Sequence, residues 1–469
     1  MSDWPAATRV QDLPGPRGWP VFGNLFQLPR STMHLQVEAW GREFGPLFTF
    51  RALGRRAVVL GDPDRVAELL RDRPDGWRRT RQLAEVAQEL GLKPGLFGAE
   101  GDLWRRQRRM VMAGLDPPRV RAYFPALVRV AARLRRRWQK AAAEGRALDL
   151  QPELMRYTVD GVAGLAFGVD MNTLESDGVV IQQHLDRLFP ALYQRAISPV
   201  PYWRWWRRQA DRDLDASIAE VRRTIAGFIA DARARLAADP ARRAEPPNLL
   251  EAMIVGSEDG TLQIDDEQIA ANVMTLLLAG EDTTANTLAW CLNLLQLNPA
   301  ALARAAGEVR RVAPDIEAIT PEQLGALDWV EGCLHETMRL KPVAPFLVVQ
   351  ALKTQRIGAL EIPPDTLLWC ALRPPAVDER HFPRPLEFDP ARWGEGGHAA
   401  RRVSMPFGAG PRTCPGRYLA LVEMKLVLAM LLAHFEIEAV EAPGGGLARE
   451  RMSFTMVPVG LKMRLRPRP

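Results

Sequence analysis

Apolar residues recur every three to four positions along many stretches of the chain. This spacing places the apolar side chains on one face of a helix, so it predicts amphipathic helices packed on a common core. The stretches cover residues 102–112, 119–143, 154–167, 211–236, 265–297, 299–312, 327–340 and 418–432.

Strand patterns are fewer and lie mostly near the two ends. Residues 47–60 are rich in β-forming side chains, with Gly54 between two runs, which predicts a hairpin. Residues 348–369 form short strand patterns broken by glycine and proline, and residues 435–465 return to strands. Residues 374–405 are rich in proline and glycine and are expected to be irregular. A mainly α fold with small β-sheets follows.

Length and composition describe an ordinary globular protein. The 469 residues are 47% hydrophobic and 25% charged. Proline, alanine and arginine in 238–247 predict a surface loop, but nothing marks a domain boundary, so residues 1–469 are expected to form one domain. The net charge of +6 is spread over short arginine clusters. This favours a protein-docking surface over nucleic-acid binding.

The termini and cysteines bear on the compartment. Residues 1–16 lack a cationic start followed by an apolar core, and the chain has no apolar run long enough to span a bilayer. No signal peptide or transmembrane anchor is therefore expected. Four scattered cysteines favour a reducing compartment, here the cytoplasm.

One cysteine stands in an unusual setting. Cys414 belongs to the glycine-rich sequence Phe-Gly-Ala-Gly-Pro-Arg-Thr-Cys-Pro-Gly over 407–416, which runs directly into a helix pattern. A helix N-terminus favours the thiolate, glycines allow close approach to a flat group, and Arg412 offers charge to an anion. These features suit a haem with cysteine as its axial ligand. Taken alone, Cys414 is equally explained as a buried free cysteine near a turn.

The loop resembles the cysteine-ligand loop of the cytochrome P450 superfamily. All five positions of its Phe-x-x-Gly-x-Arg-x-Cys-x-Gly pattern match: Phe407, Gly410, Arg412, Cys414 and Gly416. The resemblance covers nearly the whole chain. It implies one α-rich domain that holds haem b between two long helices. Cys414 is then the iron ligand, and Phe407, Arg412 and Gly416 belong to the cofactor site.

A polar patch, Ala-Gly-Glu-Asp-Thr-Thr over 279–284, interrupts the long apolar helix pattern. Apolar sequence on both sides places these polar groups inside, where they are costly without a function. The alternative is a helix that crosses from core to surface. The patch resembles the family's oxygen-activation motif. That implies that Thr283 hydrogen-bonds the oxygen or a nearby water, that Asp282 feeds a proton relay, and that Ala279 and Gly280 leave space above the iron.

Glu336 and Arg339 stand three apart on one predicted helix face. An exposed ion pair is the commoner outcome of this spacing. The pair resembles the family's Glu-x-x-Arg helix, which implies a buried cluster with Arg392 that locks the segment before the cysteine loop. This role is structural.

Trp104 and Arg108 stand four apart and share one face of a basic helix pattern. They resemble the helix that binds a haem propionate. The alternative, a solvated basic face, fits Arg105, Arg106 and Arg109 better.

Two departures from the family pattern concern the cofactor. Pro415 has no backbone N–H to offer the sulfur, which predicts an electron-rich thiolate and a lower iron potential. Residues 346–350 lack the arginine that many members carry there. Propionate neutralisation is therefore expected to rest on Trp104, Arg108 and Arg412.

The resemblance implies a haem-thiolate monooxygenase that inserts one oxygen atom from O2 into a lipophilic small molecule, by hydroxylation or epoxidation. Substrate contacts are expected, by resemblance, from residues 77–97, 184–206, 276–283, 343–348 and 452–455. A peroxide-driven peroxygenase, a haem-thiolate isomerase or dehydratase, and a haem-binding sensor are the alternatives. The first two need no acid–alcohol pair.

This sequence contains neither a Gly-x-Gly-x-x-Gly phosphate loop nor a ferredoxin-type cysteine set. A separate ferredoxin or flavodoxin is the expected electron donor. It would dock on Arg105, Arg106, Arg109, Arg417 and Lys425. A monomer is expected.

The segment 199–208 combines aromatic and cationic residues. Its tryptophans either cap the core or form an amphipathic lid near the substrate channel, with peripheral membrane contact as a further role.

Overall fold

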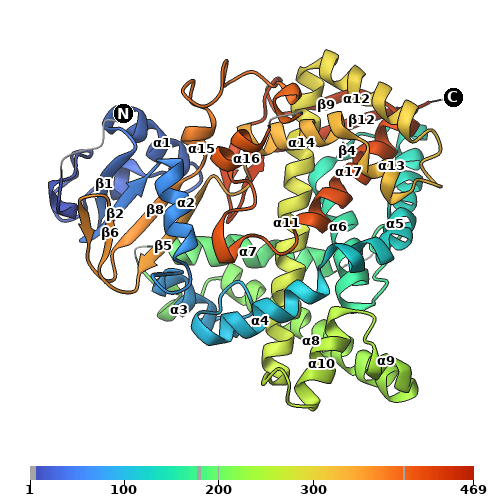
Figure 1. Ribbon diagram of the computed structural model, residues 1–469, viewed down its shortest axis with the longest axis horizontal. Coiled ribbons are helices and arrows are strands. Elements are labelled where there is room, and N and C mark those ends of the chain that lie inside the picture. The colour runs from blue at the N-terminus through green and yellow to red at the C-terminus, as the bar shows by residue number, and fades with distance from the viewer. Residues whose placement is uncertain (1–6, 177–180, 199, 395–396, 469) are drawn as a thin grey trace.

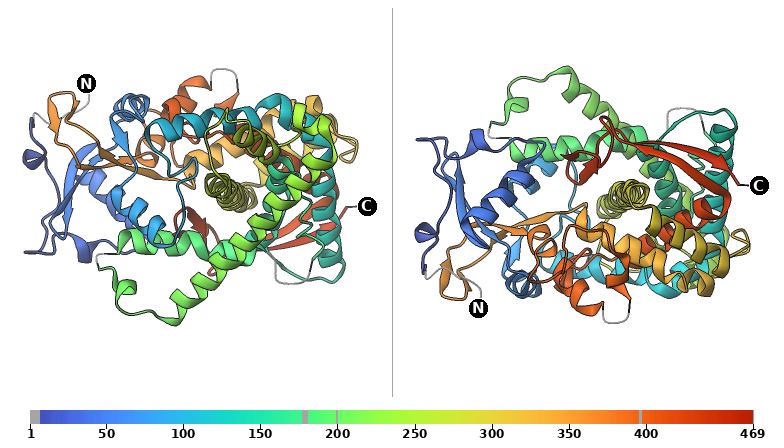
Figure 2. Two further views of the ribbon diagram at one scale, coloured as in Figure 1. Left: turned by 90° about the horizontal axis from the view of Figure 1, so that it is seen from below. Right: turned by 90° about the horizontal axis from the view of Figure 1, so that it is seen from above.

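The computed structural model describes residues 7–176, 181–198, 200–394 and 397–468. Helix α11 (Asp266–Leu297) runs through the middle of the molecule (Figure 1), and both views of Figure 2 show it end-on. It packs against α6 (Leu150–Phe167), α8 (Gln209–Ala238), α14 (Asp328–Leu340) and α17 (Arg417–His434). The largest cluster of buried apolar side chains lies among these helices.

The helices expected from periodicity are present, with boundaries that differ by a few residues. Besides those named above, they are α4 (Gly101–Gly114), α5 (Pro117–Ala143) and α12 (Pro299–Val312). Five more were not predicted: α1 (Met33–Phe44), α2 (Pro63–Arg71), α3 (Arg81–Glu89), α7 (Ile181–Ile197) and α10 (Leu249–Glu258). Most are short, and α7 carries a proline inside, which weakens the helical signal.

The remaining helices are single turns or little more: α9 (Pro240–Ala244), α13 (Pro321–Gly325), α15 (Arg373–Ala376) and α16 (His398–Ser404). The expectation of a plain loop over 238–247 was therefore wrong. Asp239 caps a short helix there, because its side chain accepts from the backbone N–H of Ala241 and Pro240 fits the first helical position.

A five-stranded sheet lies at the N-terminal end of the molecule (Figure 1). Its order is β1 (Leu47–Ala52), β2 (Arg55–Leu60), β8 (Leu367–Ala371), β5 (Phe346–Ala351), β3 (Trp77–Arg78). The predicted hairpin is confirmed: β1 and β2 pair antiparallel, with Leu47 opposite Leu60. Leu53 and Gly54 form its turn with φ of 48° and 74°.

Three smaller sheets complete the fold. β4 (Leu148–Asp149), β12 (Lys462–Pro467) and β9 (Phe435–Glu441) form one, β10 (Glu450–Met452) pairs with β11 (Met456–Pro458), and β6 (Gln355–Ile357) pairs with β7 (Leu360–Ile362). The fold is mainly α with small sheets, as the sequence predicted. Across the described ranges, no helix has both the length and the apolarity that a membrane crossing requires.

Candidate functional site

The centre of α11 carries a narrow accessible stripe on an otherwise buried helix. From Leu276 to Leu295 nearly every residue is buried, but Ala279, Gly280, Asp282 and Thr283 keep accessible surface. These positions follow helical spacing, so one face of the helix borders open space in the interior.

Asp282 is firmly held on this stripe. Its carboxylate accepts a hydrogen bond of 2.8 Å from Asn286 Nδ2 and another from the hydroxyl of Thr455, in the turn between β10 and β11. Burial raises the pKa of Asp282 to about 6, against the lowering effect of these two donors. A carboxyl group with this pKa exchanges its proton near neutral pH.

Thr283 lies beside Asp282 and donates to the carbonyl oxygen of Ala279 at 2.8 Å. Its hydroxyl oxygen keeps acceptor capacity toward the open side. Gly280 has a packing reason to lack a side chain, since a Cβ there would lie 2.5 Å from Val162 Cγ2 on α6. Close contact between α6 and α11 requires the glycine, whereas Ala279 faces the open space.

The cysteine loop lies directly before α17. Cys414 is only half-buried, yet burial raises the pKa of its thiol. A group that is accessible and strongly desolvated faces a recess inside the protein. The backbone N–H of Gly416 and the charges of Arg108 and Arg417 act in the opposite direction and favour the thiolate.

Glycines shape this loop. Gly410 has φ of 70° and approaches Leu70 so closely that a Cβ would lie 2.1 Å from its carbonyl oxygen. Gly408 has φ of 74°, and a Cβ there would meet nothing within 4 Å. The loop is thus packed on α2 at Gly410 and bordered by free space at Gly408.

Trp104 and Arg108, two predicted cofactor residues, lie on α4 next to the cysteine loop. Arg108 is half-buried, and burial lowers its pKa while Cys414 raises it. Trp104 is buried, with the guanidinium of Arg412 4.8 Å above its ring. Arg412 donates to the carbonyl oxygen of Ala99 at 2.7 Å and pairs with Glu100. The fold therefore gathers Trp104, Arg108, Arg412 and Cys414.

Two further arginines, Arg73 and Arg79, belong to the same cluster, and no sequence motif predicted this role for them. Arg73 is 4% exposed, and its Nε and Nη2 atoms find no hydrogen-bond partner among the described residues. Its positive charge and that of Arg412 both lower the pKa of Arg79, after burial. Glu100 is the carboxylate that acts on all three guanidinium groups. The cluster has excess buried positive charge.

The predicted Glu336–Arg339–Arg392 cluster is present and buried. Arg339 forms two hydrogen bonds with the carboxylate of Glu336, at 2.7 and 2.8 Å. The same carboxylate accepts from Arg392 Nε at 3.3 Å, from Trp393 Nε1 at 2.9 Å and from the Asp389 backbone at 2.9 Å. These bonds fix the irregular segment that leads to the cysteine loop.

Comparison with known proteins decides the family. The cytochrome P450 family model matches residues 13–465. The chain belongs to the cytochrome P450 family. The crystal structure of the cytochrome P450DA heme domain superposes with a TM-score of 0.83 at 26% identity, over 97% of this chain and 98% of that one. The protein described here is therefore a cytochrome P450 monooxygenase, an oxidoreductase.

Relatives with assigned activities are diverse. The human mitochondrial 25-hydroxyvitamin D-1 alpha hydroxylase is 28% identical over 97% of this chain and 92% of its own. The rice tryptamine 5-hydroxylase is 29% identical over 90% of this chain and 83% of its own. A self-sufficient P450 monooxygenase of Penicillium expansum is 28% identical, and this chain spans 43% of its length.

The residues of this P450 fit the haem that the family implies. A haem needs a thiolate ligand, open space beside it and cations for its propionates. Cys414 faces a recess, Gly408 borders free space, and unpartnered nitrogens of Arg73 and Arg412 lie in a cluster short of negative charge. Arg73 and Arg79, from outside the motifs, lie with Arg412 and would add two cations for the propionates.

In segment 199–208 of this P450, one tryptophan is buried and two are exposed. Trp203 is 8% exposed, and its Nε1 donates to Glu89 Oε2 at 2.7 Å. Trp205 and Trp206 are 74% and 73% exposed. Trp203 thus caps the core, and only its two neighbours remain as lid or surface residues. Pro199 lies outside the described residues.

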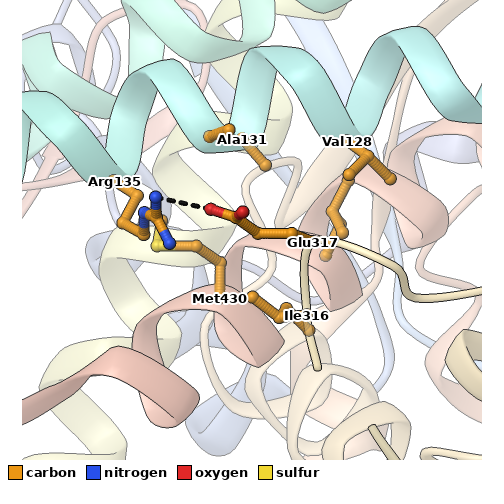
Figure 3. A pocket seen from close by; sticks show the side chains of 8 residues that line it. Val128, Ala131, Arg135, Ile316, Glu317 and Met430 are labelled. Atoms are coloured by element: carbon orange, nitrogen blue, oxygen red, sulfur yellow. Dashed lines mark ion pairs between the residues drawn. The ribbon is translucent and has the colours of Figure 1, made fainter. Parts of the chain in front are cut away.

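Two surface cavities lie away from this site. One, of about 10 Å³, is lined by Val128, Arg135, Ile316 and Met430, with an Arg135–Glu317 ion pair at its rim (Figure 3). It has room for about one water molecule. The other, of about 710 Å³, is an open groove between α5, the end of α6 and residues 242–248.

Proposed function

We propose that this P450 binds haem b through Cys414 and inserts one oxygen atom from O2 into a lipophilic small molecule. The observation that carries the proposal is that two partly exposed groups lie on elements that pack together: the thiol of Cys414, directly before α17, and the Asp282–Thr283 pair on α11. The chain has no Cys-x-x-Cys-His sequence for covalent haem attachment, which supports haem b.

The haem would be held by Cys414 at its iron and by Trp104, Arg108, Arg412, Arg73 and Arg79 at its propionates. Phe407, Gly416 and Ala279 would border it. When bound, it supplies the redox chemistry that activates oxygen. The N–H of Gly416 and the charges of Arg108 and Arg417 favour the thiolate form of the sulfur, against burial, which raises the pKa of the thiol.

Proton delivery is the task of the α11 stripe. Asp282, with a pKa of about 6, takes up a proton on a carboxylate oxygen and releases it to the hydroxyl of Thr283 or to a water beside it. Asn286 and Thr455 orient this carboxylate. The acid–alcohol pair favours an O2-dependent monooxygenase over a peroxygenase or an isomerase.

Replacing Asp282 by asparagine is expected to lower turnover about a hundredfold, because it removes a general acid. Replacing Thr283 by alanine is expected to divert reducing equivalents into hydrogen peroxide while substrate still binds. Both are checked by comparing NADPH consumed, peroxide formed and product made, with a surrogate redox partner.

Thr284→Ser is the matched control, since Thr284 is the next residue on α11 and is buried away from the stripe. It should keep normal coupling. Normal coupling in both Asp282→Asn and Thr283→Ala would refute the relay.

The electron donor is proposed to be a separate acidic ferredoxin or flavodoxin, which docks on exposed arginines near the cysteine loop. Arg109 and Arg417 are exposed there. Arg105 is exposed but pairs with Asp75 and Asp102, and Arg106 is half-buried. Lys425 was wrongly expected on this face: it is 4% exposed and pairs with Glu331 at 2.9 Å.

Charge reversal of Arg109 to glutamate is expected to slow reduction by the donor severalfold at low salt and much less at high salt, since exposed charges are screened. Stopped-flow reduction at several ionic strengths measures this. Lys353→Glu, in an exposed turn after β5, is the matched control. Reduction of Arg109→Glu at the wild-type rate at every salt concentration would argue against this docking face.

The four free cysteines support a cytoplasmic, reducing location as part of the same proposal. A monomer, peripheral membrane contact and one domain over residues 1–469 stay predictions.

A further inference from the structure

Asp186 lies on α7, within the range 184–206 that was predicted to contact a lipophilic substrate. An acidic side chain was not expected to take part there. Its side chain is accessible, yet burial raises its pKa to about 7, and the charge of Asp282 raises it further. An accessible carboxylate with this degree of desolvation lies in a recess walled by protein, not on an outer surface. Phe189, three residues along α7, stacks on Phe454, and the adjacent Thr455 donates to Asp282, so this part of α7 lies beside the α11 stripe.

No cation among the residues that the structure describes pairs with this carboxylate. Within the described ranges, Asp186 forms no ion pair, and Gln182 donates a hydrogen bond to it at 3.3 Å. Neighbouring Arg187 is directed to Ser217 on α8 instead, at 3.2 Å. A desolvated carboxylate without a cationic partner takes up a proton near neutral pH, and a ligand that supplies a positive charge can take the place of that proton.

A second, independent observation comes from Glu281. It is 2% exposed, and its Oε1 atom has no hydrogen-bond partner in the part of the chain that the structure describes. Burial raises its pKa well above the usual range, and Asp186 contributes more to this than Asp282 does. Glu281 is therefore protonated and uncharged near neutral pH, and its unsatisfied oxygen shows that this part of the interior is poor in hydrogen-bond donors and cations.

Aromatic rings lie next to Asp186. Phe189, one helical turn along α7, stacks on Phe454 with ring centroids 4.5 Å apart. Phe97 lies 5.7 Å from Phe454 and carries the guanidinium of Arg79 over its ring at 3.2 Å. The charge of Arg79 belongs to the cluster of Arg73 and Arg412, so the Phe189–Phe454 pair is the aromatic surface available to a ligand.

Backbone strain indicates that the position of Phe454 matters. Its φ is 94°, in a region that bulky residues rarely adopt. This conformation puts its ring on Phe189 while the next residue, Thr455, donates to Asp282. The turn between β10 and β11 thus connects the aromatic pair to the proton-delivery residue.

We propose that Asp186 and the Phe189–Phe454 pair form a subsite for the positively charged nitrogen of a lipophilic amine or quaternary ammonium substrate. Carboxylates and aromatic faces together are what such a cation requires once it leaves water. The hydrocarbon part of the substrate lies along the apolar walls, and the cation fixes its orientation relative to Asp282 and Thr283. The inference rests on the proposed function, because it assumes that this recess is the substrate site.

The probes are 4-phenylbutyl-trimethylammonium and its neutral isostere, in which tert-butyl replaces the trimethylammonium group. The quaternary nitrogen has no lone pair for the iron, so a change in affinity reports the pocket. Calorimetric titration of the haem-loaded protein gives both dissociation constants. The wild-type protein should bind the cation more tightly than the isostere, and a preference for the isostere would overturn the proposal without any variant.

Asp186→Asn is expected to weaken binding of the cation about ten- to thirtyfold and that of the isostere less than about twofold. Asp186→Glu, which keeps the charge, should retain most of the preference. Asp213→Asn, which removes one exposed charge from α8, is the matched control and should change neither affinity. Equal losses for both probes in Asp186→Asn, or no loss, would overturn the proposal.

The thiolate-type spectrum is recorded on the same samples. Its absence would show that the proposed function fails, whereas its presence with an unchanged cation preference would show that only this inference fails. A loss of coupling in Asp186→Asn with an unchanged preference would assign Asp186 to proton delivery instead, and would equally overturn the subsite.

Discussion

Replacement of Cys414 by histidine is expected to abolish monooxygenase activity and the red-shifted Soret band of the reduced carbonyl adduct, even where haem is retained. The reason is that the thiolate is the strong electron donor of the site, and imidazole is a weaker one. Gly416, Arg108 and Arg417 all favour the thiolate form of Cys414. Difference spectroscopy of the purified variant, together with product analysis, measures both effects.

The three other cysteines provide matched controls. Cys291, Cys333 and Cys370 are fully buried, and burial raises the pKa of Cys291 and Cys370 to about 12. Such thiols are poor metal ligands. Replacing each by alanine should leave the band in place. Loss of the band in one of these variants, with a normal band in Cys414→His, would disprove the ligand assignment.

Replacement of Glu336 by glutamine is expected to destabilise the protein by about 3–5 kcal/mol and to impair haem incorporation. Glu336 and Arg339 are each 0% exposed, so the variant leaves a buried guanidinium without its counter-charge. The hydrogen bonds to Asp389, Arg392 and Trp393 weaken at the same time, which loosens the path to the cysteine loop. Urea unfolding and the haem-to-protein ratio measure the two effects.

The matched control for Glu336→Gln is an ion pair with the same three-residue spacing that is exposed to solvent. Arg65 and Glu68 also stand three apart and pair at 2.9 Å, but their side chains are 43% and 59% exposed. Glu68→Gln should change stability by less than about 1 kcal/mol, because water screens an exposed pair. Equal effects of the two substitutions would show that burial of the Glu336 cluster contributes nothing.

The contiguous motifs could be recognised from sequence because their chemistry is local. The cysteine loop, the acid–alcohol pair and the Glu-x-x-Arg helix each place their residues within one turn, one helix face or one short loop. Helical spacing alone puts Trp104 above Arg108 and Glu336 beside Arg339. The same local rule predicted most long helices, because their apolar residues repeat over several turns.

Local rules failed where two residues of one type face different surroundings. Trp203 and Trp205 are two positions apart, but only Trp203 meets Glu89 of α3 and becomes buried. Lys425 was expected at the surface because lysine usually is, but it is buried next to Glu331 of α14. Neither partner is close in sequence, so no periodic pattern could reveal the burial.

The sequence by itself determined the family, the mainly α fold and the identity of the candidate iron ligand, because these depend on short motifs and on repeating apolar faces. The tertiary structure alone decided which charges surround the site. Arg73 and Arg79 lie near Arg412 although more than three hundred residues of chain separate them, and Asp282 of α11 lies close enough to Asp186 of α7 for its charge to raise the pKa of Asp186. A charge acquires its cost and its function from burial beside particular neighbours, and packing of distant elements sets that burial.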